Sequence, residues 1–329
     1  MKGRKMIFLF LLQVLLFLAP ASADDLLKGP PFTDPSVIQP MPEGWEEQPV
    51  IHETGSRRPD IVVTLDQHLY PLFADYIRKY AARERISIEV DEGTCGITAG
   101  KLARKTADVG GYCCPPGGAD RLPGLSFHTV GIMPVAVLVH PDNPVEDLDI
   151  RQVREIFGGK FYRWSEVKDL GGRRGKNIRI EAIGRLHCKL RPGHWGLLLD
   201  NEDLFSPSLT EVGTIPDMIS LVARMPGAIG YEVPLMVGRY SKQGKVKVIS
   251  LNGVAPGAPA LAAGRYPLYR TLNLTTWEGK AAKNEKAEKL VRQLLSEAEH
   301  LEGKHGFVPA SSLRRKGWKF KGDELVGEP

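Results

Sequence analysis

The chain of 329 residues carries 44 basic and 39 acidic side chains, which gives a formal net charge of +5. This near balance argues against a nucleic-acid-binding domain, because such domains concentrate a large basic excess. The length and an apolar fraction of 42% are sufficient for one large or two medium-sized domains with buried cores.

The N-terminus predicts a secretory signal peptide over residues 1–23. Three basic residues within the first five positions precede an apolar run over 7–18, and Ala21 and Ala23 supply the small residues of a cleavage site. The run is too short for a membrane-spanning helix. We therefore expect a periplasmic or otherwise exported protein with no membrane span after cleavage.

Residues 24–59 contain seven prolines and no sustained period, which predicts an extended arm or linker. The next residues alternate between strand and helix patterns, with strands predicted at 61–65, 86–90 and 129–139 and helices at 67–80 and 97–105. Asp66 stands at the N-cap position of the first of these helices. This alternation favours an α/β domain with a largely parallel sheet.

The pattern continues beyond residue 141. Asp149 and Gln152 predict a capping box at the start of a helix, and Thr214 predicts the N-cap of another. The remaining elements are strands at 178–183, 228–231 and 269–275, helical segments at 195–199 and 279–301, and a surface loop at 255–264.

The stretch 91–116 holds three of the four cysteines. Its turn, Gly93-Thr94-Cys95-Gly96, precedes a predicted helix, so backbone N–H groups and the positive end of the helix dipole point into the turn. Such a turn is typical of an anion-binding cradle. Here sulfur stands among the side chains of the cradle.

A series of short motifs follows a fixed order along residues 60–300. They are the stretch 92–115, Asn143-Pro144-Val145, Ile156-Phe157-Gly158-Gly159-Lys160, Arg163-Trp164-Ser165-Glu166-Val167, Ile183-Gly184-Arg185, Pro226-Gly227-Ala228-Ile229-Gly230-Tyr231 and Tyr266-Pro267-Leu268. In order and spacing they resemble the phosphate-type periplasmic substrate-binding proteins of ABC transporters.

This resemblance implies an α/β, two-lobed periplasmic-binding-protein type 2 fold with a ligand cleft between the lobes. The chain would cross between lobes near 134–138 and 266–270, so that one lobe comprises 60–133 plus 269–329 and the other 134–268. Hinge closure around a small-molecule solute and recognition by a membrane permease are further implications. No catalytic pattern with the necessary context is present, so we expect a binding protein and not an enzyme.

The resemblance also implies which residues contact the ligand, and several depart from the family pattern. The expected ligand-binding residues are Asp66, Gln67, Thr94, Cys95, Gly96, Tyr112, Cys113, Cys114, Arg185, His187, Cys188, Lys189 and Arg191. Arg185 stands at the position of the family's anion clamp, but no Ser-Gly-Thr follows it. All four cysteines fall on the loops that the family uses for its ligand, which puts phosphate itself in doubt.

Three uses of the sulfur remain open. An exported protein favours a disulfide, here between Cys95 and either Cys113 or Cys114. A soft-ligand site for a transition metal or a haem-like cofactor is the second, with Cys95, Cys113, Cys114, Cys188, His187 and His194 as candidate ligands. Reactive thiol chemistry is the third.

Two functional hypotheses follow from these patterns. The first is an exported solute-binding protein that binds a small oxyanion-like solute between its lobes for transport or sensing. The alternative is a periplasmic carrier or assembly factor that binds a transition metal, a haem-like cofactor or a thiol partner through the Cys/His cluster. Neither hypothesis involves nucleic acid, and either allows another periplasmic protein as partner.

Overall fold

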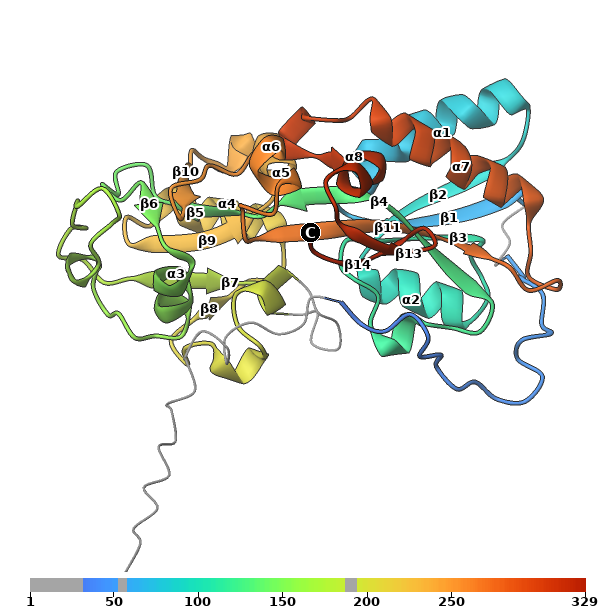
Figure 1. The fold of residues 1–329 in the computed structure, drawn as a ribbon, viewed down its shortest axis with the longest axis horizontal. Helices are drawn as coiled ribbons and strands as arrows, with labels where there is room; N and C mark the ends of the chain where they lie inside the picture. Colours follow the sequence, from blue (N-terminus) through green and yellow to red (C-terminus); the bar gives the residue numbers. More distant parts are fainter. Residues whose placement is uncertain (1–31, 53–57, 187–193) are drawn as a thin grey trace, which may run out of the picture.

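The computed structural model describes residues 32–52, 58–186 and 194–329 as an α/β protein with two lobes, each built on a six-stranded sheet (Figure 1). In the first sheet the order is β12-β4-β11-β3-β1-β2, with bounds β1 Ile61–Asp66, β2 Ile88–Gly93, β3 Val109–Tyr112, β4 Leu125–Pro134, β11 Tyr269–Trp277 and β12 Val308–Pro309. In the second it is β6-β10-β5-β9-β7-β8, with bounds β5 Ala136–Val139, β6 Asp147–Leu148, β7 Glu181–Gly184, β8 Thr210–Glu211, β9 Ala228–Glu232 and β10 Lys247–Leu251.

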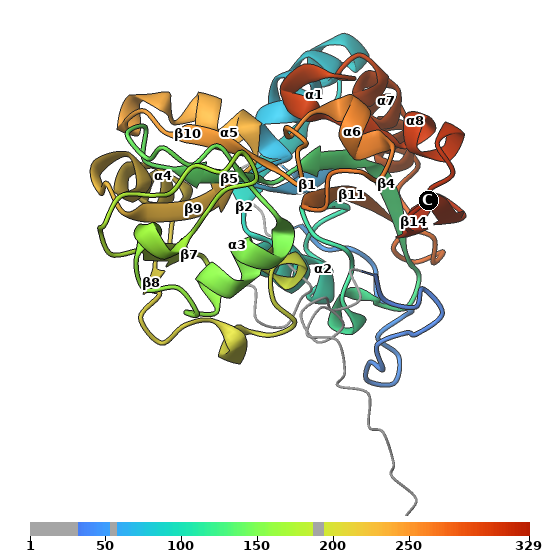
Figure 2. The ribbon, with the colours of Figure 1, turned by 60° about the vertical axis from the view of Figure 1, so that its left-hand side comes forward.

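Helices cover both sheets. Those of the first lobe are α1 Tyr70–Glu84, α2 Cys95–Ala103, α7 Glu285–Glu299 and α8 Ala310–Arg315, and those that follow second-lobe strands are α3 Ile150–Phe157, α4 Ile215–Arg224, α5 Pro234–Arg239 and α6 Ala258–Ala262. Helices α1 and α7 lie on one face of the first sheet and α2 on the other (Figure 1, Figure 2). A small hairpin, β13 Lys319–Lys321 and β14 Glu324–Gly327, ends the chain.

Both sheets are mixed, so the prediction of a largely parallel sheet is wrong. Strand β1 runs parallel to β2 and β3, but β11 pairs antiparallel with β3 and β4. The reason is that β11 re-enters the first lobe from the second, beside the strand through which the chain left.

The long strand predicted at 129–139 is two strands in different sheets. Strand β4 ends at Pro134 and β5 begins at Ala136, and the N–H of Val135 between them donates to the carbonyl of Leu268 at 2.9 Å. Every residue from 130 to 139 is buried, so the apolar pattern carries no mark of this change of sheet. The two crossings between the sheets therefore lie side by side.

Helix starts follow their capping residues in two of three cases. Asp149 caps α3 with the predicted capping box, and Thr214 caps α4 by accepting from the N–H of Asp217. The predicted N-cap at Asp66 is wrong, because α1 begins at Tyr70 and the Asp66 carboxylate accepts from the N–H of His68 instead. The predicted loop at 255–264 also contains a helix, α6.

Replacing Asp149 with alanine is expected to lower the free energy of unfolding by about 1 kcal/mol, since the Gln152 N–H would lose its partner at 2.8 Å. Replacement with asparagine keeps an acceptor at the N-cap and should cost only a few tenths of that. A urea titration followed by circular dichroism compares the two variants. Equal losses for both would show that the cap does not stabilise α3.

The proline-rich arm docks on the first lobe. The indole of Trp45 packs against that of Trp277 with ring centroids 5.9 Å apart, and the Lys105 ammonium lies 4.3 Å from the Trp45 ring centroid. The same ammonium donates to the carbonyls of Glu46 and Gln48 at 3.0 and 2.6 Å. In Figure 1 the arm, in blue, runs below α2. It is therefore part of the folded first lobe over the residues described.

Among the described helices, none has the length and apolar character needed to cross a membrane. The predicted signal peptide at 1–23 lies outside the described residues.

Candidate functional site

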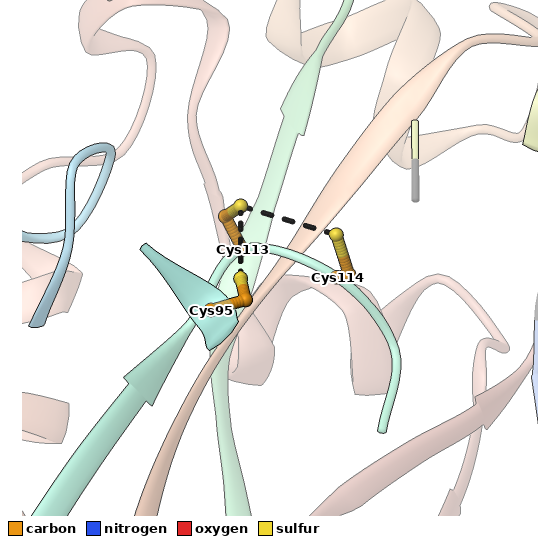
Figure 3. A group of neighbouring side chains, drawn as sticks. All are labelled: Cys95, Cys113 and Cys114. Atoms are coloured by element: carbon orange, nitrogen blue, oxygen red, sulfur yellow. Dashed lines mark hydrogen bonds between the residues drawn. The ribbon is translucent and has the colours of Figure 1, made fainter. Parts of the chain in front are cut away.

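Three cysteines meet where α2 begins and β3 ends. Cys95 is the first residue of α2, and Cys113 and Cys114 follow β3 directly. The Sγ atom of Cys113 is 3.5 Å from that of Cys95 and 3.9 Å from that of Cys114. Dashed lines join these atoms in Figure 3. All three side chains are at most 3% exposed. Two segments 18 residues apart thus bring their sulfur atoms into one buried group, here called the thiol trio.

Glycines bring these segments close together. A Cβ atom at Gly110 would lie 2.5 Å from Leu102 and 2.9 Å from Thr98, both on α2. A Cβ atom at Gly111 would lie 2.7 Å from a side-chain carbon of Leu65 on β1. The absence of side chains at these two positions therefore lets α2 and β1 approach β3 directly before the cysteine pair.

The predicted disulfide from Cys95 is not formed in this structure. A disulfide requires the two sulfur atoms to be about 2.05 Å apart, and both distances measured from Cys113 Sγ are much longer. No bond joins Cys95, Cys113 and Cys114 to one another. The three side chains are thiols in contact.

A buried chain of charged groups links the two lobes beside the thiol trio. His68, in the turn after β1, contacts Asp66 through Nδ1 at 2.9 Å and Glu232 of β9 through Nε2 at 3.0 Å. Glu232 also accepts from Nη1 of Arg185 at 3.1 Å. The Asp66 carboxylate accepts from the thiol of Cys95 at 3.6 Å. The chain of contacts thus runs from the thiol trio in one lobe to Arg185 in the other.

Arg270 joins the trio to this network from the strand that re-enters the first lobe. It is the second residue of β11 and only 3% exposed. Its Nη1 donates to the carbonyl of Cys113 at 3.3 Å and to Cys113 Sγ at 2.7 Å. Asn273, three residues further along β11, donates to the carbonyl of Cys114 at 3.1 Å. Strand β11 therefore holds the backbone and one sulfur of the cysteine pair.

The network sets the charges of its members. Burial alone would raise the pKa of Asp66, but the charge of His68 and its hydrogen bonds lower that pKa to about 2. Burial likewise disfavours the charged form of His68, yet the carboxylates of Asp66 and Glu232 raise its pKa well above the usual value. Despite its burial, Glu232 has a pKa far below the ordinary range because His68 and the neighbouring guanidinium groups favour the carboxylate.

Burial has the dominant effect on the thiol of Cys113. Removal from water raises its pKa well above the usual value, even though the Arg270 guanidinium favours the thiolate. The described groups at the junction therefore comprise three cations, Arg185, Arg270 and His68, and two anions, Asp66 and Glu232. This leaves one positive charge in excess among them.

Arg185 has a donor without an acceptor. The side chain is 2% exposed, and its Nε atom is buried with no hydrogen-bond partner. Its backbone N–H is satisfied by the hydroxyl of Tyr231 at 3.0 Å. An unsatisfied buried donor on a charged group is costly, so this atom marks a place where an acceptor would stabilise the protein.

The structure brings together five of the predicted ligand-binding residues: Asp66, Cys95, Cys113, Cys114 and, through Glu232, Arg185. Thr94 is the N-cap of α2, Gln67 is half-buried, Gly96 is exposed and Tyr112 is buried against Phe127. His187, Cys188, Lys189 and Arg191 lie outside the described residues. His194 begins a short 3-10 helix, His194–Leu197. Ligand contact by any of these residues stays a prediction.

Three members of the network were not predicted from the sequence. Glu232 directly follows the Pro226–Tyr231 motif, His68 stands two residues after Asp66, and Arg270 lies inside a strand that is otherwise uncharged. A charged residue in a buried strand is rare without a partner. The single charge of Arg270 in an otherwise uncharged strand could therefore have indicated a buried partner. The pairing of His68 with Glu232 gave no such indication, because these residues are 164 positions apart.

Comparison with known proteins gives one match in sequence and several in structure. The chain is 28% identical over 186 residues to the phosphate-binding protein PstS of Bacillus subtilis (strain 168), which covers 55% of this chain and 58% of that protein. No family model matches the chain.

Similarity to solved structures extends over more of the chain than the sequence match does. A phosphate transport receptor of the ABC type from Vibrio cholerae matches with a TM-score of 0.60 and 19% identity, over 76% of this chain and 99% of that one. A protein from Clostridium perfringens crystallised with bound phosphate matches with a TM-score of 0.57 and 17% identity, over 82% and 99%. The predicted fold class is confirmed: the chain has the two-lobed α/β fold of the phosphate-type substrate-binding proteins.

Proposed function

We propose that this protein is an exported solute-binding protein that binds a small oxyanion between its lobes and delivers it to an ABC permease or a sensor. The observation that carries the proposal is the buried Arg185, whose Nε has no acceptor. A bound oxyanion would supply one. Similarity to PstS and the shared fold support the solute-binding class.

The charge of the lobe junction supports an anionic solute. Among the described groups, three cations face two carboxylates. A buried charge without a counter-charge costs several kcal/mol, so a monoanion placed among Arg185, Arg270 and His68 would be stabilised strongly. A guanidinium can also donate two parallel hydrogen bonds to an oxyanion. Selection among oxyanions would then depend on the thiols, which replace the hydroxyls expected from the family pattern.

The test is calorimetric titration of the purified full-length protein with phosphate, sulfate, arsenate, molybdate and selenite in turn. We expect one of these anions to bind with one site per chain. Replacing Arg185 with lysine keeps the charge but removes the planar pair of donors, and should weaken binding by about 10- to 100-fold.

Arg179 provides the matched control. It lies on the same lobe, pairs with Glu181 at 3.4 Å and has a half-exposed side chain. Arg179→Lys should bind the anion as the unchanged protein does. The proposal is overturned if none of the five anions produces heat with a protein that melts cooperatively, and equally if Arg185→Lys binds as tightly as the unchanged protein.

A further inference from the structure

We propose that Cys95, Cys113 and Cys114 together bind one divalent thiophilic metal ion, for which zinc serves as the probe. This inference does not depend on the proposed function. It rests on the geometry of the thiol trio, on the charge around it and on the groups that hold it.

The spacing of the sulfur atoms suits a single ion. Zinc binds cysteine sulfur at about 2.3 Å in tetrahedral sites, which places neighbouring sulfur atoms about 3.8 Å apart. The Sγ atoms here are 3.5 and 3.9 Å apart, and all three lie within 4.8 Å of one another. Thiols packed in a core have similar distances, so spacing alone does not distinguish the two cases.

The charge of the surroundings favours a metal over plain packing. Three thiolates and one divalent ion form a complex with a net charge of −1. The Arg270 guanidinium lies against Cys113 Sγ at 2.7 Å, so its positive charge would offset the charge of this complex directly. A monovalent ion with three thiolates would carry −2 and leave a buried negative charge. Uncompensated buried charge is costly in either direction.

The groups around the sulfur atoms are those that support thiolate ligands. Nη1 of Arg270 donates to Cys113 Sγ at 2.7 Å, and Cys95 begins α2, a helix of nine residues whose positive end favours a thiolate. Arg270 and Asn273 also hold the carbonyls of Cys113 and Cys114. Hydrogen bonds that orient the ligands and donate to sulfur are characteristic of metal sites.

The experiment uses the full-length protein, reduced and treated with a chelator, then mixed with one equivalent of zinc and passed through a desalting column. We expect elemental analysis to find one zinc per chain. Each of Cys95→Ser, Cys113→Ser and Cys114→Ser should weaken zinc binding by at least about tenfold. Thr98→Ala, which removes a buried side chain from α2 one turn after Cys95, should retain the zinc.

A second measurement on the unchanged protein covers the case in which a serine variant fails to fold. X-ray absorption at the zinc edge should find three sulfur atoms at about 2.3 Å from the metal. The inference is overturned if no zinc stays with the chain, if the metal has only nitrogen and oxygen ligands, or if the folded serine variants keep zinc as tightly as the unchanged protein.

Discussion

Replacing Glu232 with glutamine is expected to lower the free energy of unfolding by about 3 to 5 kcal/mol, the usual cost of breaking a buried ion pair from one side. Glu232 is fully buried and is the shared partner of His68 at 3.0 Å and Arg185 at 3.1 Å. Without its carboxylate, three cations at the lobe junction would face the single carboxylate of Asp66. A urea titration at neutral pH measures the loss.

Glu181→Gln is the matched control for this change. Glu181 belongs to the same lobe and pairs with Arg179 at 3.4 Å, but both side chains are partly exposed. Pairs in contact with water contribute between zero and about 1 kcal/mol. Similar losses for the two variants would mean that the junction network is no more stabilising than a surface ion pair.

Replacing Trp45 with alanine is expected to destabilise the first lobe by about 3 to 5 kcal/mol, because the cavity left by a buried indole cannot close fully. The side chain is 7% exposed, packs on Trp277 and lies beside the Lys105 ammonium. Its loss would also remove the Nε1 hydrogen bond to the carbonyl of Ala103 on α2. Thermal unfolding followed by circular dichroism is the appropriate measurement.

Ile51 offers the control for the arm, because its side chain is 63% exposed. Ile51→Ala should change the stability by no more than about 0.5 kcal/mol. If Trp45→Ala melted at the same temperature as the unchanged protein, the arm would contribute nothing to the stability of the lobe on which it lies.

Local patterns in the sequence were sufficient to predict most of the elements that surround the site. The capping residues Asp149 and Thr214 mark helix starts because the hydrogen bonds involved span only a few residues. The break at Val135 could not be predicted in this way. A fully apolar run is compatible with one strand or two, and the change of sheet depends on pairing with β9 and β11, far along the chain.

Only part of the candidate site could be predicted, again because contacts between distant segments leave no local pattern. Resemblance to a family grouped Asp66, Cys95, Cys113, Cys114 and Arg185 as ligand-binding residues. The structure joins them in one chain of contacts, and their contact with a ligand stays a prediction. The partners that determine the charge of the junction, which are His68, Glu232 and Arg270, depend on contacts between distant segments. Sequence spacing contains no record of such contacts.

The contact between His68 and Glu232 has a kinetic consequence for any molecule held between the lobes. Moving the lobes apart would have to separate these two side chains, which are at most 1% exposed and come from opposite lobes. This separation would break the ion pair between His68 and Glu232 before the bound molecule can leave. Breaking this contact, and not diffusion of the bound molecule, should therefore limit the rate at which the molecule is released. A single substitution at position 68 should shorten its residence time.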